Sequence, residues 1–431
     1  MNKTLISNTT VITMNDAADI LEAADVLVED NHIAAVGPTG TLNERDASVV
    51  DGRDRAVLPG LVNAHTHAAM TLLRGYADDL PLTEWLETKI WPREAFLREG
   101  DVYAGTMLAA AEMIRGGTTC YADMYFSSAE MAAAATDAGL RASVSGVLLG
   151  ILPSIDEDLR REIAFVESWN DPDGRVTGAF GPHSLYTCGA EVLRGVAEEA
   201  KRLGALVHLH LLETAHERDD IVALQERTPL HALREAGLLE TPVLAAHCVY
   251  LAERDVDVLA GQPFAAAHCP GSNLKLASGI APVPDFLKKG LTAALGTDGA
   301  ASNNNLDMLE EARLAALIHK ANRSDATAVT AYQALFMATR AGATALNQAG
   351  TIGQLTPGYK ADLLLINLTA PHMTPQHNVV ANIVYSAGAS DVTDTMVDGR
   401  WLMRDREVLS FNESETITKG VAAAADLVIR T

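Results

Sequence analysis

Two hydrophobic patterns alternate through the middle of the chain. Short apolar runs typical of buried strands are separated by segments whose apolar residues recur every three or four positions, as in helices that bury one face. The expected strands are residues 58–65, 117–123, 141–148, 175–181, 205–211, 242–247, 263–268 and 291–297. The clearest helices between them are residues 101–115, 128–138, 156–168, 190–203 and 306–321.

Eight strands alternating with helices favour an α/β fold built on a (β/α)8 TIM-like barrel. A doubly wound open sheet is the alternative, but the sequence lacks the glycine-rich dinucleotide fingerprint of such sheets. Both ends of the chain instead carry short β-prone runs separated by turn signals, including an Asp-Gly hairpin over residues 395–403. We expect the ends to pair into one small β-sandwich, followed by a helix over residues 416–429. The predicted domains are residues 1–57 and 355–431 as the two parts of the sandwich and residues 58–354 as the barrel.

Composition narrows the classes of partner. The 431 residues carry 33 basic and 56 acidic side chains, a net charge of −23, which argues against nucleic acid and anionic membranes as partners. No apolar run approaches the roughly 18 residues of a membrane span, and the first residues do not resemble a signal peptide, so we expect a cytoplasmic protein with no membrane partner. The four cysteines form no Cys-x-x-Cys pair and are interpreted as reduced packing residues.

Polar side chains gather at the predicted ends of the barrel strands, where such barrels place their active sites. His65 and His67 end the first strand and, being two residues apart, would share one face and offer two imidazoles to a metal ion. Further strand ends carry His183, His210, His247, His268 and Asp298. The pattern therefore predicts a metal-dependent site at the barrel mouth.

Two residues near His210 need separate treatment. His208 shares a face with His210 and is expected one layer deeper, as a core histidine. Glu213 would face away in a continuing strand and reaches the site only if the strand ends near Leu211 and the chain turns.

Several runs carry a resemblance to a known family. They are His65-Thr66-His67, Met70–Gly75, Gly181–Ser184, His210–Glu213, Ala245–Val249, Ser272–Leu276 and Gly296–Asn304. With them the chain resembles the amidohydrolase superfamily over nearly its whole length, and within it the 5-methylthioadenosine/S-adenosylhomocysteine deaminases. The resemblance implies a metal-dependent hydrolytic deaminase that converts adenine nucleosides such as methylthioadenosine, S-adenosylhomocysteine or adenosine into hypoxanthine nucleosides and ammonia.

The resemblance also implies roles for individual residues. One divalent metal ion, zinc first and iron or manganese as alternatives, would be held by His65, His67, His210 and Asp298. The implied catalytic residues are Glu213 as proton donor, either protonated from the start or by the water, His247 as the group that directs the attacking oxygen, and Asp298 as acceptor of the water's proton. The implied substrate contacts are Glu94 at the ribose, His183 at a purine nitrogen, Trp85 near the nucleoside tail, Ser302 in the loop after the last strand, and Glu213 and Asp298 themselves.

Alternatives stay open at this level. Glu94 could be a helix N-terminal acid and Trp85 a core residue. The enzyme could be a deaminase or chlorohydrolase of another aromatic N-heterocycle, such as a free base or triazine, or the chain a non-enzymatic amidohydrolase-like scaffold. A homo-oligomer, dimer or tetramer, is implied by the resemblance alone.

One departure from the family pattern bears on the substrate. Relatives that accept S-adenosylhomocysteine can carry an arginine toward the end of the third strand. Here Arg141 stands at the start of that strand, and Gly146-Val147-Leu148-Leu149 occupies its end. We therefore expect methylthioadenosine or adenosine to be preferred over S-adenosylhomocysteine.

Overall fold

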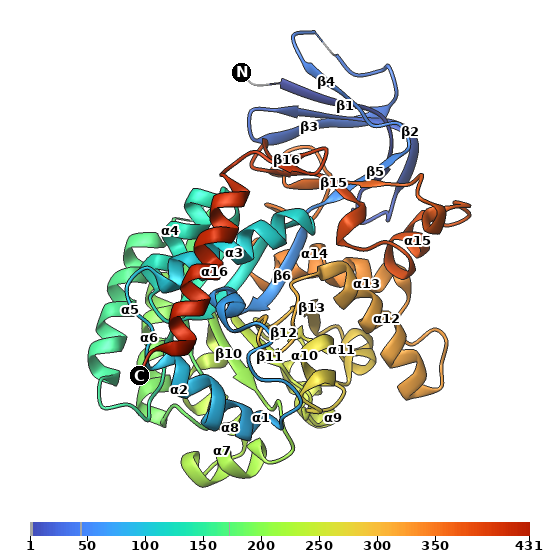
Figure 1. Cartoon of the computed structure of the whole chain (residues 1–431). Helices are drawn as coiled ribbons and strands as arrows, with labels where there is room; N and C mark the ends of the chain where they lie inside the picture. Colours follow the sequence, from blue (N-terminus) through green and yellow to red (C-terminus); the bar gives the residue numbers. More distant parts are fainter. Residues whose placement is uncertain (1–2, 44, 172) are drawn as a thin grey trace.

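Eight parallel strands form a barrel at the centre of the computed structural model, which describes residues 3–43, 45–171 and 173–431 (Figure 1). The strands lie in chain order, as β6 (Leu61–Thr66), β7 (Thr118–Tyr125), β8 (Arg141–Leu148), β9 (Val176–Pro182), β10 (Val207–Leu211), β11 (Val243–His247), β12 (Phe264–His268) and β13 (Thr292–Leu295). The ring closes where the Asp298 amide donates to the His65 carbonyl at 2.9 Å and the Asn63 side chain bonds to Thr297 Oγ1 at 2.7 Å. The predicted barrel is confirmed.

Helices surround the barrel. The five predicted ones are α3 (Asp101–Arg115), α4 (Ser128–Ala138), α5 (Ile155–Trp169), α6 (Ala190–Leu203) and α12 (Met308–Arg323). Shorter helices, α1 (Leu82–Trp85), α2 (Trp91–Glu94), α7 (Glu217–Gln225), α8 (Pro229–Glu235), α9 (Glu253–Leu259), α10 (Pro270–Lys275), α11 (Val283–Lys289), α13 (Ala331–Met337), α14 (Arg340–Ala345) and α15 (Val379–Tyr385), fill the connections. The 3-10 helices are η1 (Ala68–Leu73), η3 (Leu238–Glu240), η4 (Pro371–Met373) and η5 (Ala389–Asp391), and η2 (Leu86–Ile90) is a π-helical segment. Across the parts of the chain that the structure describes, no helix combines the length and apolar character needed to cross a membrane.

The two ends of the chain pair into a second sheet, drawn in blue and red above the barrel in Figure 1. Its strands are β1 (Lys3–Ile12), β2 (Ile20–Glu29), β3 (His32–Pro38), β4 (Ser48–Asp51) and β5 (Arg55–Pro59) from one end and β14 (Leu363–Asn367), β15 (Val392–Val397), β16 (Arg400–Arg404) and β17 (Glu407–Val408) from the other. Antiparallel pairing of β5 with β14 joins the two segments, and the sheet packs a core of its own around Ile6, Val26 and Leu363.

The predicted strand over residues 58–65 is wrong at its start. Leu58 and Pro59 belong to β5 of the second sheet, and the chain crosses to the barrel at Gly60. A side chain at Gly60 would overlap the side chain of Thr119, so the crossing requires glycine at this position. The predicted domain boundary after residue 57 falls inside β5, whereas the division after residue 354 stays a prediction.

Ion pairs tie the second sheet and the last helix to the barrel. At the start of β8, Arg141 Nε lies 2.8 Å from Asp362 Oδ2, and both side chains are buried. The helix α16 (Glu413–Ile429), which begins three residues before the prediction, packs along α3 (Figure 1). Just beyond it, Arg430 Nη2 lies 3.0 Å from Asp101 Oδ1.

Candidate active site

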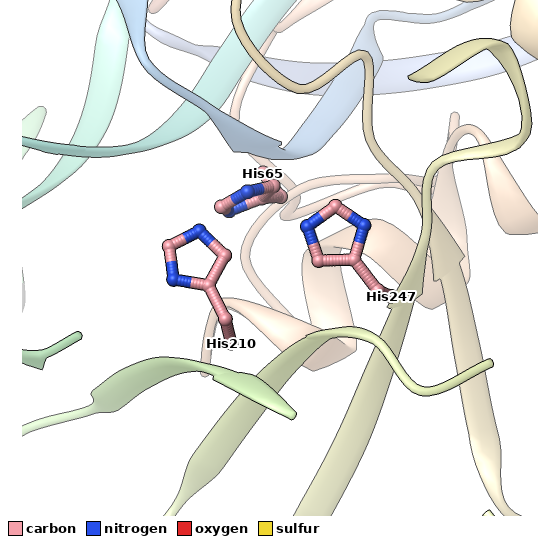
Figure 2. Close-up of side chains that lie close together, drawn as sticks. All are labelled: His65, His210 and His247. Carbon is pink, nitrogen blue, oxygen red and sulfur yellow. The ribbon is translucent and has the colours of Figure 1, made fainter. Parts of the chain in front are cut away.

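Four side chains converge at the carboxyl ends of the barrel strands. Asp298 Oδ1 lies 3.4 Å from His65 Nε2 and 3.3 Å from His67 Nε2. His210 Nε2 lies 3.2 Å from His67 Nε2. Figure 2 shows the rings of His65, His210 and His247 gathered around the same point, although they come from three different strands. The structure thus brings together all four predicted metal ligands.

The donor atoms fit a divalent ion. Nε2 of His65 is buried and has no hydrogen-bond partner among the described residues. His67 Nδ1 lies 2.5 Å from the Met124 carbonyl and His210 Nδ1 lies 2.9 Å from the His183 carbonyl. Because a carbonyl only accepts, both Nδ1 atoms carry the proton and both Nε2 lone pairs face the shared point. Three imidazole nitrogens with one carboxylate are a typical donor set for zinc or iron.

Asp298 is held as a carboxylate. The hydroxyls of Ser272 and Ser302 donate to its Oδ2 at 2.6 and 2.8 Å, while Oδ1 faces the histidines. Burial opposes the charge, but the adjacent imidazoles of His65 and His67 keep the pKa of Asp298 well below its usual value. Ser302 therefore lies in the loop after the last strand and also donates a hydrogen bond directly to Asp298, one of the proposed metal ligands.

Left-handed backbone turns the site residues toward the centre. φ is 52° at Leu212, 71° at His247 and 62° at Asp298. Each such non-glycine residue costs about 1–3 kcal/mol, and such residues cluster at active sites. Ala246 is in register with the inward-facing His210, so simple alternation would point His247 outward. The positive φ at His247 breaks that alternation.

Glu213 reaches the site in the way the sequence required. β10 ends at Leu211, the chain turns at Leu212, and Glu213 Oε2 lies 3.6 Å from His247 Nε2. Ser278 Oγ donates to the other carboxyl oxygen at 3.2 Å. Burial raises the pKa of Glu213, which favours the protonated acid. Burial acts against a charged His247, yet the Asp298 carboxylate raises the pKa of His247.

A cavity of about 410 Å³ opens above these groups. Glu94, Trp85, His183 and Ser302 all line it, together with Glu213, His247 and Asp298. Burial raises the pKa of Glu94 to about 7, and the Tyr125 hydroxyl donates a hydrogen bond to it. The Trp85 indole N–H donates to the Ala77 carbonyl at 3.0 Å, so this side chain is anchored as well as cavity-lining.

The purine-facing candidate His183 is neutral in this setting. Burial, together with the neighbouring His67 and His65, lowers the pKa of His183 to about 3. Its Nδ1 lies 3.0 Å from Thr187 Oγ1, and its ring centroid is 4.8 Å from that of His210. A fixed, uncharged imidazole suits a hydrogen bond to a purine nitrogen.

One histidine of the predicted strand-end set does not belong to the site. His268 ends β12 but faces outward, where its Nε2 lies 3.2 Å from Nε2 of His319 on α12. It has the same parity as the outer residue Ala266, and no left-handed residue turns it inward. His208 is buried below His65, and its Nε2 lies 2.8 Å from His65 Nδ1.

Other residues of the site carry no role in the sequence prediction. Asn273 Oδ1 accepts from His247 Nδ1 at 2.9 Å, and Glu217 accepts from the backbone amides of Leu212 at 2.7 Å and Glu213 at 2.5 Å. Asn273, like Ser272, lies in the run Ser272–Leu276, which carries part of the family resemblance, so the sequence holds a signal for it. Glu217 and Tyr125 carry no comparable sequence signal, because their roles follow from how two loops meet.

Comparisons with known proteins agree with this geometry. The amidohydrolase family model matches residues 56–402. The chain is 46% identical to the 5-methylthioadenosine/S-adenosylhomocysteine deaminase of Pelotomaculum thermopropionicum, covering 100% of both chains, and 45% identical to the 5'-deoxyadenosine deaminase of Methanosarcina acetivorans, covering 99% of this chain and 98% of the relative. The crystal structure of an adenosine deaminase from Xanthomonas campestris with bound zinc superposes with a TM-score of 0.95 at 38% identity, covering 100% of this chain and 99% of that one.

Proposed function

The chain belongs to the amidohydrolase family, and from this premise we propose that it deaminates adenine nucleosides, releasing ammonia and the hypoxanthine nucleoside. The observation that carries the proposal is the buried acid Glu213 facing His247 and the cluster around Asp298 in one cavity. The names of the relatives, which deaminate methylthioadenosine, S-adenosylhomocysteine, 5'-deoxyadenosine or adenosine, support the adenine nucleoside as substrate.

The family and the donor set call for a divalent metal ion, and we propose zinc, with iron and manganese as alternatives. The residues that would hold it are His65, His67, His210 and Asp298. When bound, the ion would lower the pKa of a coordinated water toward 7 and so supply the nucleophile.

Two carboxyl groups divide the proton transfers. Glu213, whose protonated form is favoured by burial, gives its proton to the ring nitrogen beside the carbon that bears the amino group, which makes that carbon electrophilic. Asp298, held as a carboxylate, takes a proton from the attacking water and passes it to the amino group, which leaves as ammonia. The remaining hydroxyl proton returns to Glu213 as the new carbonyl forms. His247, fixed by Asn273, directs the attacking oxygen.

The lining of the cavity supports the proposed binding contacts. Glu94 accepts hydrogen bonds from the ribose hydroxyls, His183 forms a hydrogen bond with a purine nitrogen, and Trp85 lies beside the 5' tail of the nucleoside. The proton-transfer groups Glu213 and Asp298 favour deamination over the removal of chloride from a triazine, because an amine leaves only after protonation. The ribose-binding carboxylate Glu94 favours a nucleoside over a free base, because a free base has no hydroxyls to donate to it. The homo-oligomer and the cytoplasmic location stay predictions; light scattering would measure the former.

The cavity favours substrates with an uncharged 5' tail. No lysine or arginine is among the described residues that line it, whereas Glu87 and Asp220 are. Its apolar lining includes Leu82, Leu86, Ile90, Phe126, Val147 and Leu149. Arg141 is paired with Asp362 at the opposite end of β8 and cannot reach the tail. A homocysteine carboxylate bound here would lack a cationic partner, at a cost of about 1–3 kcal/mol or roughly 5- to 150-fold.

The test compares kcat/KM for 5'-deoxyadenosine, methylthioadenosine, adenosine and S-adenosylhomocysteine by the absorbance change of adenine-to-hypoxanthine conversion. S-adenosylhomocysteine is expected last. Val147→Arg should improve its rank, whereas the uncharged control Val147→Gln should not. Higher kcat/KM for S-adenosylhomocysteine than for the neutral nucleosides would refute the tail preference, and no conversion of any of the four would refute the proposed function.

A further inference from the structure

A chain of hydrogen bonds runs through the barrel interior beneath the proposed metal ligands. Ser145 Oγ lies 2.8 Å from the Asp123 carbonyl and 3.4 Å from His208 Nδ1. On its other side, His208 Nε2 lies 2.8 Å from His65 Nδ1. All three side chains are buried, and neither Ser145 nor His208 lines the substrate cavity.

The direction of this chain is fixed from its far end. The Asp123 carbonyl can only accept, so the single hydroxyl proton of Ser145 points at it. The lone pairs of Ser145 then face His208, which makes His208 Nδ1 the protonated nitrogen of that neutral ring. His208 Nε2 is left as an acceptor, and His65 must donate to it from Nδ1. Nε2 of His65 is consequently bare and faces the site.

The opposite tautomer would be incompatible with metal binding. A proton on His65 Nε2 would occupy the lone pair that faces His67, His210 and Asp298. The other two histidine ligands avoid this state by donating directly to main-chain carbonyls of Met124 and His183. His65 has a second imidazole as its partner instead, and an imidazole can either accept or donate. The tautomer of His65 is fixed only because the hydroxyl proton of Ser145 already points at the Asp123 carbonyl, which leaves His208 Nε2 as the acceptor for His65.

We propose that Ser145 and His208 are positioning residues that set the tautomer of His65 and thereby tune the affinity of the site for its divalent metal ion. The inference rests on the metal centre of the proposed function. It assigns a purpose to two buried polar residues that touch neither the substrate cavity nor the shared ligand point. Outer partners of this kind typically alter metal affinity about 10- to 100-fold.

A matched pair of variants isolates the acceptor. Gln at position 208 places an amide oxygen near the location of Nε2, whereas Met has a similar length and shape but only a weak acceptor. The measurement is the zinc dissociation constant of the purified full-length protein, obtained by competition with a chromophoric chelator. His208→Met should weaken zinc binding by about 10- to 100-fold, and His208→Gln should stay within about threefold of the parent, a loss of no more than about 0.7 kcal/mol.

A double-mutant cycle tests the role of Ser145. Ser145→Ala should weaken zinc binding in the parent protein, because His208 is then free to take either tautomer. The same substitution should have no further effect in the His208→Met background, because a thioether has no tautomer or amide flip for Ser145 to set. An effect of equal size in both backgrounds would show that Ser145 acts through packing alone and would overturn the proposal.

Two further outcomes separate this inference from the proposed function. Equal zinc affinity for the parent, His208→Met and Ser145→Ala would overturn the positioning role of Ser145 and His208 and leave the proposed metal centre intact. No zinc binding by the parent would overturn both. Should His208→Met fail to fold, a comparison of Ser145→Ala with Ser145→Thr, which keeps the hydroxyl, still decides the matter: equal zinc affinity of these two variants would overturn the proposal.

Discussion

Replacing Glu213 by glutamine tests its proposed proton transfer. Glu213 is 8% exposed, accepts one hydrogen bond from Ser278 at 3.2 Å and lies 3.6 Å from His247. Glutamine has nearly the same shape, and its carbonyl oxygen can keep the bond from Ser278. The fold and the four proposed ligands should therefore be preserved, and only the exchangeable proton is lost.

The expected loss follows from that single missing step. A positioned acid or base contributes about 10²- to 10⁴-fold to a rate, which corresponds to about 2.7–5.5 kcal/mol of barrier. For Glu213→Gln we expect kcat to fall in this range, with zinc content and melting temperature close to those of the parent. The control is Asp219→Asn, which removes one acidic side chain on the same segment but lies exposed on α7, outside the cavity lining.

The assay records initial rates with 5'-deoxyadenosine alongside metal content by elemental analysis. A Glu213→Gln protein that keeps its metal and turns over within threefold of the parent would refute the proton-transfer role. Loss of metal together with activity would mean that Glu213 supports the metal centre rather than the chemistry.

Three more expectations concern Glu94, the buried Arg141–Asp362 ion pair and the proposed metal ion. The pKa of Glu94 is raised to about 7, so lowering the pH from 8 to 6 should protonate the ribose-binding carboxylate and raise KM, a dependence that Glu94→Gln should lack; a pH-independent KM in the parent would contradict this. Arg141→Met should lower the free energy of unfolding by about 3–5 kcal/mol in denaturant, because it leaves the buried Asp362 without its cationic partner. Arg53→Met, at the exposed ion pair with Asp51, should change the free energy of unfolding little. Removing the metal with a chelator should lower the melting temperature, with zinc at 1,000 times its dissociation constant restoring about 4 kcal/mol, and His67→Ala should show no such response.

The strand-end pattern determined much of the site in advance. Repeated strand–helix periodicity placed His65, His210 and Asp298 at one end of a barrel, and parallel strands bring such ends together. What periodicity could not distinguish was His247 from His268. Both end a strand on its outer parity, and only the left-handed backbone at His247 turns that ring inward, while His268 stays outside with His319.

Contacts between loops could not be predicted from the sequence either. Glu217 bonds to the amides of Leu212 and Glu213 because the chain reverses there, and no spacing rule anticipates the bond. The division of the run 58–65 at Gly60 arises from pairing with β14, more than 300 residues later in the chain. Such long-range pairing leaves no mark in a local apolar run.

The most direct test of the account measures ammonia and hypoxanthine nucleoside together. Chelator-treated protein is assayed with 5'-deoxyadenosine before and after zinc is restored, by the absorbance change and by a coupled ammonia assay. We expect no turnover without metal and, after zinc is added, one ammonia for each hypoxanthine nucleoside formed. Zinc-loaded protein that releases no ammonia from the nucleoside, or undiminished turnover after the metal has been removed, would contradict the central claim.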